Sequence, residues 1–146
     1  LLGEDPFLLV NGDIWLDLEY ARLAEIKLTG LAHLILVNNP EHNPQGDFYL
    51  SGVSVTDNNN TSVNNSIGEN KYTFSGVSIL DPQLFESCEA GVFKLAPLLK
   101  NAMAENSVSG EYYNGYWLDV GTPERLAELD AHVIDARNTG TKEKIV

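Results

Sequence analysis

A short apolar run near the start of the chain, Phe7 to Val10, stops abruptly at Asn11-Gly12-Asp13. Uninterrupted apolar runs of this length are typical of strands that are buried on both faces, as in parallel sheets. A helical apolar pattern follows over residues 17–30, with Asp17 as its candidate N-cap, and residues 31–37 are again strand-like. The order strand, helix, strand indicates a crossover unit. We therefore expect an α/β fold in which Phe7–Val10 is a central parallel strand.

The middle of the chain continues to alternate between strand and helix patterns. Residues 48–55 suggest a strand or bent hairpin, and the Asn-rich residues 56–66 indicate a loop. Residues 72–80 resume strand character around Gly76, which marks either a bulge or a place where a ligand approaches the backbone. After a turn or short helix at Asp81-Pro82, residues 94–104 have the apolar spacing of a helix.

The last part of the chain predicts a hairpin and a helix. Asn114-Gly115 separates the strand-like residues 108–113 and 116–120, and this dipeptide is a strong signal for a two-residue hairpin turn. Thr122 and Pro123 then suit the N-cap and first position of a terminal helix.

Composition limits the classes of protein that fit. The 146 residues are enough for one domain, and 43% of them are hydrophobic, which is sufficient for a core. Nine basic residues oppose 21 acidic ones, so the net charge of -12 disfavours nucleic acid and anionic membrane as partners. The single Cys88 excludes an internal disulfide, and no secretory or membrane segment is recognisable. We therefore expect a cytoplasmic protein.

Two aspartates follow strand-like segments more than a hundred residues apart. Asp13 comes directly after the first apolar run, and Asp119 lies between Trp117-Leu118 and Val120-Gly121. Ligands in open α/β sheets bind outside the carboxyl ends of strands. Mg²⁺ prefers oxygen ligands, and it commonly takes one or two carboxylates while water and substrate phosphates complete its shell. The pair thus indicates a shared Mg²⁺ site and phosphate chemistry.

Several motifs together resemble those of the sugar-1-phosphate nucleotidyltransferases, in particular the uridylyltransferases of bacterial cell-wall recycling. The resemblance extends from about Asp5 to about Leu129. The motifs that carry it are Asn11-Gly12-Asp13, Gly46-Asp47-Phe48, Thr73-Phe74-Ser75-Gly76-Val77, Phe93-Lys94-Leu95-Ala96-Pro97-Leu98-Leu99 and Trp117-Leu118-Asp119-Val120-Gly121-Thr122. This resemblance implies a three-layer, Rossmann-like α/β fold with a mixed sheet.

The resemblance also implies a reaction. A sugar 1-phosphate, either N-acetylmuramate or N-acetylglucosamine 1-phosphate, would attack the α-phosphate of a nucleoside triphosphate, with UTP as the expected donor. The products would be a nucleotide sugar and pyrophosphate. Catalysis of such an in-line displacement consists mainly of positioning the reactants and neutralising charge with Mg²⁺.

Roles for individual residues follow from the same resemblance. Asp13 and Asp119 would be the Mg²⁺ ligands, Asn11 would lie beside the sugar phosphate, and Gly76 would let the backbone approach the sugar. Two further acids, Asp47 and Glu111, are either contacts to sugar hydroxyls or solvated acids. Four other positions receive no binding role: Lys94 is interpreted as a solvated residue at a helix start, and His33, His42 and His132 lack the spacing of a zinc site.

Two family motifs have no counterpart in this sequence. One is the glycine-rich loop with an Arg and a Pro-Lys-Pro segment, which in the family holds the triphosphate; the other is a Glu-Lys-Pro segment, whose interval here contains the Asn-rich residues 58–66. The sequence also begins at Leu1 rather than at Met. We therefore expect residues 1–146 to be the C-terminal, sugar-phosphate- and metal-binding portion of one truncated nucleotidyltransferase domain, inactive alone. A truncated sheet would expose an edge, so we expect it to associate with its missing half or to form a homo-oligomer.

Two alternative functions remain open. A noncatalytic sugar-phosphate binding or regulatory module would show the same motifs without the nucleotide-binding loop. A nucleotide-dependent glycosyltransferase would share the fold, but its metal-binding acids usually form Asp-x-Asp. Asn11 stands at the first of these positions, which disfavours that class.

Overall fold

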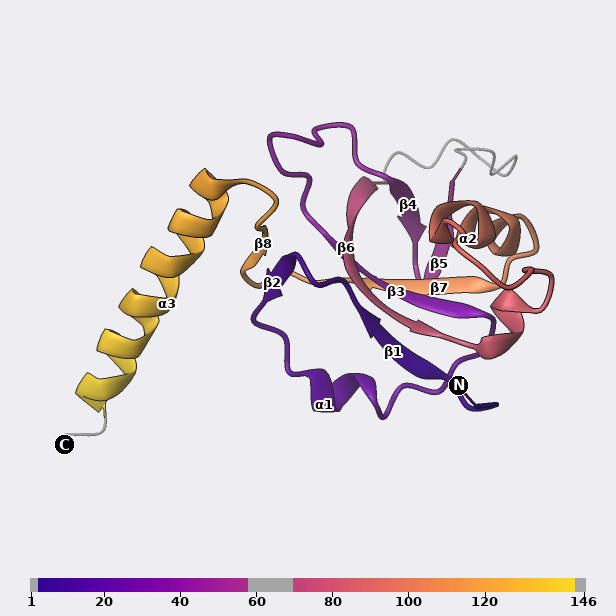
Figure 1. Cartoon of the computed structure of the whole chain (residues 1–146), viewed down its shortest axis with the longest axis horizontal. Coiled ribbons are helices and arrows are strands. Elements are labelled where there is room, and N and C mark those ends of the chain that lie inside the picture. The colour runs from indigo at the N-terminus through magenta and orange to yellow at the C-terminus, as the bar shows by residue number, and fades with distance from the viewer. Residues whose placement is uncertain (1–2, 58–69, 144–146) are drawn as a thin grey trace. The chain divides into compact units, whose positions relative to one another are not determined.

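The computed structural model describes residues 3–57 and 70–143, and these form two compact units (Figure 1). The sheet unit comprises Leu1–Val10 and Glu19–Asn114, and the ribbon unit comprises Asn11–Leu18 and Gly115–Val146. Most of the loop predicted over residues 56–66 lies outside the described residues. Among the described helices, none combines the length and the apolar character needed to cross a membrane.

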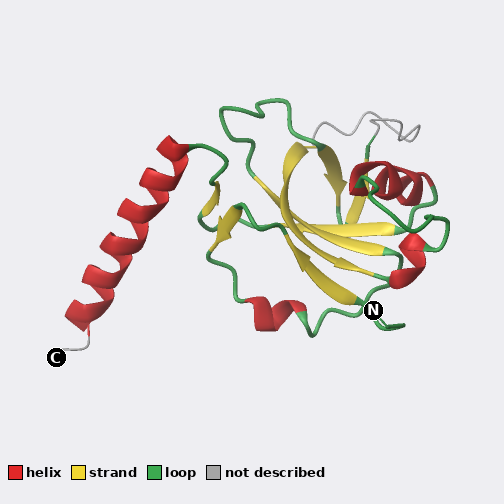
Figure 2. Cartoon of the chain, in the orientation of Figure 1, coloured by secondary structure: helices red, strands yellow, loops and turns green. Residues whose placement is uncertain are grey.

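The sheet unit is built on a six-stranded mixed sheet, drawn in yellow in Figure 2. Its strands are β1 (Phe7–Val10), β3 (Ala32–Val37), β4 (Phe48–Ser51), β5 (Ser54–Thr56), β6 (Asn70–Leu80) and β7 (Val108–Tyr112). They are arranged in the order β1-β6-β3-β7-β5-β4, and β4 also pairs with β6. Among the pairs that these described strands form, β3–β7 is parallel and the others are antiparallel.

Strand β6 is long enough to pair with two strands along the same side. Its first residues pair with β4, with Tyr72 opposite Phe48, and its last residues pair with β1, with Leu80 opposite Phe7. Gly76 lies between these two stretches. β4 therefore returns to β6, and five strands close into a ring with β1 as an additional edge strand.

The predicted position of Phe7–Val10 as a central parallel strand was wrong. β1 is an edge strand that runs antiparallel to β6, which separates it from β3. Phe7 and Leu9 pack against the core, whereas Leu8 and Val10 are about 40% exposed (42% and 40%). Because every residue of the run is apolar, the sequence does not show which side chains face the core and which face solvent.

The helix predicted over residues 17–30 is also shorter than expected. Helix α1 spans only Tyr20–Leu23, and its N-cap is Glu19 rather than Asp17. The Glu19 side chain makes no capping hydrogen bond. A single turn without such a bond has little intrinsic stability, so α1 depends on its contacts with the sheet.

Helices cover both faces of the sheet, which confirms the predicted layered α/β architecture. Helix α2 (Leu95–Ala104) and the short 3-10 helix η1 (Pro82–Phe85) pack on one face. The main core lies there, and its buried members are Ala32, Leu34, Leu36, Phe48, Val55, Leu80, Leu84, Leu99, Ala102, Met103 and Val108. Leu23 of α1 is 1% exposed on the opposite side, which is defined by the alternate residues His33 and Ile35 of β3.

The ribbon unit consists of a two-stranded antiparallel ribbon and a long helix. Its elements are β2 (Ile14–Leu16), β8 (Trp117–Asp119) and α3 (Pro123–Glu143). The hairpin predicted around Asn114-Gly115 was wrong, because β7 pairs with β3 and β5 while β8 pairs with β2. The amide of Tyr113 still donates to the carbonyl of Leu36 at 2.8 Å, so the chain continues along β3 where a hairpin would have turned.

The other predicted helix starts are confirmed. The Thr122 hydroxyl accepts a hydrogen bond of 3.2 Å from the amide of Arg125, and Pro123 is the first residue of α3. Helix α2 begins one residue later than predicted, with Lys94 as an exposed N-cap residue. These starts depend on local chemistry, which the sequence displays directly.

Candidate metal-binding site

The β2–β8 ribbon brings Asp13 and Asp119 to the same end of the ribbon unit. Ile14 lies opposite Asp119 in the antiparallel register, so Asp13 immediately precedes one strand at the end where the other strand finishes. The carbonyl oxygen of Asp13 accepts a hydrogen bond of 2.8 Å from the amide of Val120. At the far end, the amide of Asp17 donates to the carbonyl of Tyr116 at 3.2 Å. The ribbon is thus closed at both ends by backbone hydrogen bonds.

The two carboxylates have different surroundings. Oδ1 of Asp119 accepts a hydrogen bond of 2.8 Å from the amide of Gly121 and lies 3.6 Å from the guanidinium of Arg125. The Asp13 side chain is exposed, and within the described residues no hydrogen bond or ion pair engages it. Asp119 is therefore oriented by its neighbours, whereas Asp13 keeps its acceptor capacity for a ligand.

Both acids carry carboxylate oxygens, which are the kind of ligand that Mg²⁺ prefers. Along a strand, neighbouring side chains point to opposite faces, so Asp13 would point away from Asp119 if it followed the alternation of β2. Asp13 lies in the turn before β2, where that alternation does not apply. Among the described residues, no group of three or more His, Cys, Asp and Glu side chains could hold a metal ion. Two carboxylates are nevertheless the usual protein contribution to an Mg²⁺ that also takes water and phosphate oxygens.

Arg125 is a site residue that the sequence analysis missed. It lies in the first turn of α3, three residues after the N-cap Thr122, so the helix turns its guanidinium back toward Asp119. The short connection from Asp119 to a capped helix could have indicated this. A Cβ atom at Gly121 would come within 2.9 Å of the Asp119 Oδ1 atom and 3.0 Å of the Arg125 guanidinium, so the absence of a side chain there permits the pair.

The predicted sugar residues Asn11 and Gly76 are each one position beyond the last β1–β6 pair, Val10 with Val77. Asn11 is exposed and belongs to the ribbon unit, whereas Gly76 is buried in the sheet unit. Gly76 has a φ of 88°, a conformation that residues with a Cβ atom rarely adopt. It lies where the β3–β6 register is irregular, because three residues of β6 face one residue of β3. The bulge anticipated as one interpretation of Gly76 is therefore present.

Asp47 holds a loop against β6. One carboxylate oxygen accepts from the Asn43 side chain at 3.0 Å and the other from the amide of Phe74 at 2.8 Å. The Asp47 amide donates to the carbonyl of Tyr72 at 2.7 Å, and Asn43 also donates to the Thr73 hydroxyl at 3.1 Å. Asp47 is thus a hydrogen-bonded residue within the sheet unit and not a solvated acid.

Glu111 is likewise engaged within the sheet unit. Its Oε2 atom accepts from Arg22 of α1 at 3.1 Å, and its Oε1 atom lies 3.7 Å from Nε2 of His33. Nδ1 of His33 is 2.9 Å from the hydroxyl of Ser109. His33 received no role from the sequence, because only the pairing of β3 with β7 brings it beside Ser109 and Glu111.

The structure therefore divides the predicted site residues between the two units. Asn11, Asp13 and Asp119 belong to the ribbon unit, whereas Asp47, Gly76 and Glu111 belong to the sheet unit. Within the ribbon unit the two predicted metal ligands share one end of the ribbon.

Comparison with curated proteins finds relatives over nearly the whole chain. An N-acetylmuramate alpha-1-phosphate uridylyltransferase from Neisseria meningitidis is 46% identical over 136 residues, which are 90% of this chain and 56% of that protein. The bifunctional protein GlmU of Methanococcus aeolicus is 28% identical over 149 residues, covering 95% of this chain and 34% of that protein. The GlmU of Methanocaldococcus jannaschii is 30% identical over 152 residues, covering 97% and 35%. No family model matches the chain.

A solved structure has the same fold. It is described as a glucose-1-phosphate thymidylyltransferase from Bacillus anthracis in complex with a sucrose, and it superposes with a TM-score of 0.60 at 14% identity. The match covers 89% of this chain and 55% of that structure.

The fold and the sequence similarity define a nucleotidyltransferase-type α/β protein. The chain belongs to the sugar-1-phosphate nucleotidyltransferase family, and among the relatives described above the uridylyltransferase has the highest identity. It spans about half the length of that uridylyltransferase and about a third of each GlmU protein.

Proposed function

We propose that this chain is the metal- and sugar-phosphate-binding portion of an enzyme that transfers a uridylyl group from UTP to a sugar 1-phosphate. The acceptor would be N-acetylmuramate 1-phosphate or N-acetylglucosamine 1-phosphate, and pyrophosphate would be released. The identity of 46% to a uridylyltransferase carries this proposal. The shared ribbon end of Asp13 and Asp119 supports it, because phosphoryl-transfer sites need carboxylates that hold a divalent cation.

In this proposal Asp13 and Asp119 hold Mg²⁺. When bound, the cation would neutralise charge on the phosphate oxygens during transfer. The amide of Gly121 and the guanidinium of Arg125 fix the Asp119 carboxylate through Oδ1. The ribbon itself keeps the two acids at one end, which limits the reorganisation needed when the substrate arrives.

Asn11 of the ribbon unit is proposed to contact the sugar phosphate, and Gly76 of the sheet unit is separately proposed to let the sugar approach the backbone. The Asn11 amide can donate to phosphate or hydroxyl oxygens, and Gly76 has no side chain to exclude the sugar from the backbone. Asp47 and Glu111 remain predictions as sugar contacts. Their carboxylates already hold the 38–47 loop and α1, so we assign them a supporting role.

We place the reaction in the cytoplasm, since a single Cys and a nucleotide substrate suit a reducing compartment that contains UTP. The 146 residues contain no glycine-rich triphosphate loop, so the chain by itself should bind without turnover. Residues other than 1–146 would have to supply the triphosphate contacts.

A noncatalytic binding module is the second candidate, because residues 1–146 contain no glycine-rich triphosphate loop. Both candidates require the chain to bind a sugar 1-phosphate. Isothermal titration with N-acetylglucosamine 1-phosphate and N-acetylmuramate 1-phosphate, in Mg²⁺ and in EDTA, tests this shared requirement. Metal-dependent binding of either sugar supports the proposal, and absence of binding with and without Mg²⁺ contradicts it.

Reading the coding frame on both sides of this sequence then separates the two candidates. A contiguous glycine-rich segment with Arg and Pro-Lys-Pro would support the enzyme. Pyrophosphate release from UTP by that longer protein is the decisive assay. Stop codons close to both ends would support the binding module.

A further inference from the structure

Four polar side chains meet on the face of the sheet opposite α2. His33 comes from β3, Ser109 and Glu111 from β7, and Arg22 from α1. The Ser109 hydroxyl lies 2.9 Å from Nδ1 of His33 and 3.4 Å from the carbonyl of Ala32, to which it donates. In the neutral tautomer with its proton on Nδ1, the ring donates to this hydroxyl and Nε2 carries the lone pair.

Nε2 of His33 then faces Oε1 of Glu111 across 3.7 Å, acceptor to acceptor. Nε2 is buried without a hydrogen-bond partner, and the buried Oε1 lies 3.1 Å from Arg22 Nη1. A proton on Nε2 would convert this contact into a donor facing a carboxylate, which is the stronger, charge-assisted kind of hydrogen bond. Two arrangements that differ by one proton are therefore available: Glu111 bonded to Arg22 with His33 neutral, and Glu111 bonded to a protonated His33.

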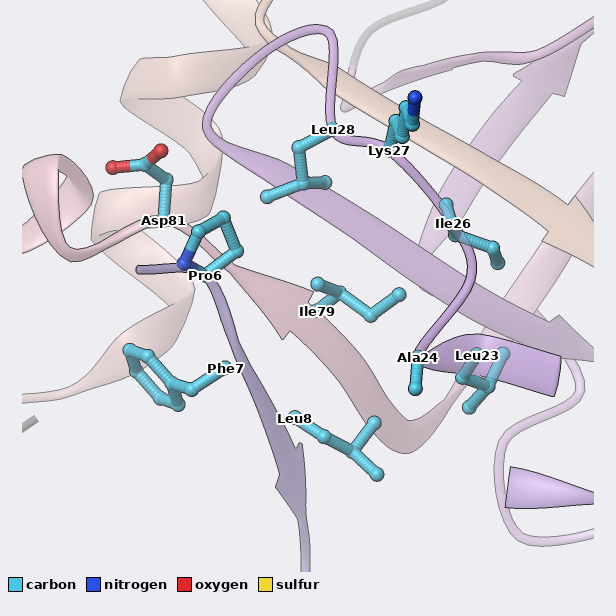
Figure 3. A pocket seen from close by; sticks show the side chains of 10 residues that line it. All are labelled: Pro6, Phe7, Leu8, Leu23, Ala24, Ile26, Lys27, Leu28, Ile79 and Asp81. Carbon is cyan, nitrogen blue, oxygen red and sulfur yellow. The ribbon is translucent and has the colours of Figure 1, made fainter. Parts of the chain in front are cut away.

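The same carboxylate fastens α1 to the sheet. Arg22 Nη1 lies 3.1 Å from each oxygen of Glu111, and Leu23 is the buried apolar contact of this single-turn helix. α1 and the segment after it form one wall of a pocket of about 510 Å³, and Leu8 and Ile79 line it from the sheet (Figure 3). Movement of α1 would therefore change access to this pocket.

We propose that His33, Glu111 and Arg22 form a proton-sensitive latch, which holds α1 against the sheet at neutral pH and releases it when His33 is protonated. The side chain of His33 is 12% exposed and fixed by Ser109, whereas that of Arg22 is 44% exposed. Water can replace the partner of an exposed guanidinium at low cost, but not that of a buried imidazolium. When His33 and Arg22 are both cationic, the Glu111 carboxylate therefore bonds preferentially to His33.

The groups around His33 shift its pKa in opposite directions. Burial lowers the pKa of His33, the Glu111 carboxylate raises it, and the Arg22 charge lowers it. The hydrogen bond from Arg22 to Glu111 raises the pKa of Arg22, and Glu19 and Tyr113 add to this. On β6 the register partner of His33 is the apolar Ile79. Release of α1 removes both the nearby Arg22 charge and part of the burial, so protonation and release favour each other.

Hydrogen exchange of the whole chain, followed by mass spectrometry of peptides covering residues 17–30, tests the latch. Rates are corrected for intrinsic exchange and compared at about pH 7.5 and about pH 5.5, on either side of the ordinary His pKa of about 6.5. Exposed ion pairs are worth up to about 1 kcal/mol, so we expect α1 opening to increase about two- to fivefold at the lower pH. H33Q should abolish this increase, and the matched control H42Q, at an exposed histidine, should keep it.

R22Q supplies a second variant at an exposed position that leaves the core intact. It should open α1 already at about pH 7.5 and show little further change on acidification. Equal pH responses in the wild type, H33Q and R22Q would overturn the latch, as would a wild type whose α1 protection is the same at both pH values.

Discussion

The carbonyl oxygen of Asp13 accepts a hydrogen bond from the amide of Val120, the residue that follows Asp119. This single backbone contact ties together two segments that are more than a hundred residues apart in the chain. It lies at the end of the β2–β8 ribbon where both predicted metal ligands are found. The backbone of Asp119 is therefore placed by strand pairing, and that of Asp13 by this hydrogen bond at the end of the ribbon.

Replacing Gly121 with Ala should disturb the Asp119 carboxylate without unfolding the protein. The new Cβ atom would lie 2.9 Å from Oδ1 of Asp119 and 3.0 Å from Arg125, and both side-chain ends must move. We expect Mn²⁺ affinity, followed by electron paramagnetic resonance, to fall about two- to tenfold, while the melting temperature changes little. In the control G12A nothing lies within 4 Å of the added atom, so unchanged affinity is expected. Equal affinities in both variants would argue against an oriented Asp119.

Replacing Gly76 with Ala should destabilise the sheet unit. At a φ of 88° a Cβ atom is strained, and such positions cost about 1–3 kcal/mol. Urea unfolding measures the loss, and G12A again serves as the matched control because Gly12 does not have a positive φ. A G76A variant as stable as G12A would show that the bulge in β6 relaxes easily.

Asp47 should prove to be a stability residue. D47N replaces one acceptor oxygen with a donor, so either Phe74 or Asn43 loses its partner. Leaving a part-buried donor unpaired costs about 1–3 kcal/mol. Thermal unfolding of D47N, compared with E41Q at an exposed acid of the same loop, measures this cost. If D47N and E41Q have the same melting temperature, Asp47 does not hold the loop in solution.

Folding stability should decrease as the pH falls below the ordinary His pKa of about 6.5. Burial lowers the pKa of His33 in the folded chain, so below that pH the unfolded chain binds more protons. Proton binding therefore stabilises the unfolded chain relative to the folded chain. Above about pH 6.5 both states hold a neutral His33 and its contribution is constant. Urea titrations at about pH 7.5 and 5.5 should show a smaller loss in H33Q than in the wild type and H42Q. An identical loss in all three would exclude His33 as the source.

Local signals in the sequence were reliable where local chemistry decides the structure. The Thr122 N-cap, the following Pro123 and the start of α2 near Lys94 occur as predicted or within one residue. Each depends on the residue's own hydrogen bonding or backbone restriction, which does not need distant partners.

Long-range pairing explains what the sequence could not show. Asn114-Gly115 favours a tight hairpin, but β8 pairs with β2 instead. The Phe7–Val10 run does not reveal which of its apolar residues face the core, because periodicity needs polar residues to mark the other side. The cluster of Arg22, His33 and Glu111 likewise arises only when α1, β3 and β7 meet. The two acids were expected to share a site, but the antiparallel ribbon that joins them was not anticipated.

Metal titration of the chain with and without the two aspartates is the most direct test of the site. Mn²⁺ binding would be measured by electron paramagnetic resonance in the wild type, D13N and D119N, with N-acetylglucosamine 1-phosphate present. D130N, an exposed acid of α3 in the same unit, is the control for loss of one charge. We predict that D13N and D119N each weaken binding at least about tenfold, since loss of a residue that merely orients a metal ligand already costs about 10- to 100-fold in affinity. Affinities in D13N and D119N equal to that of D130N would contradict a metal site at this end of the ribbon.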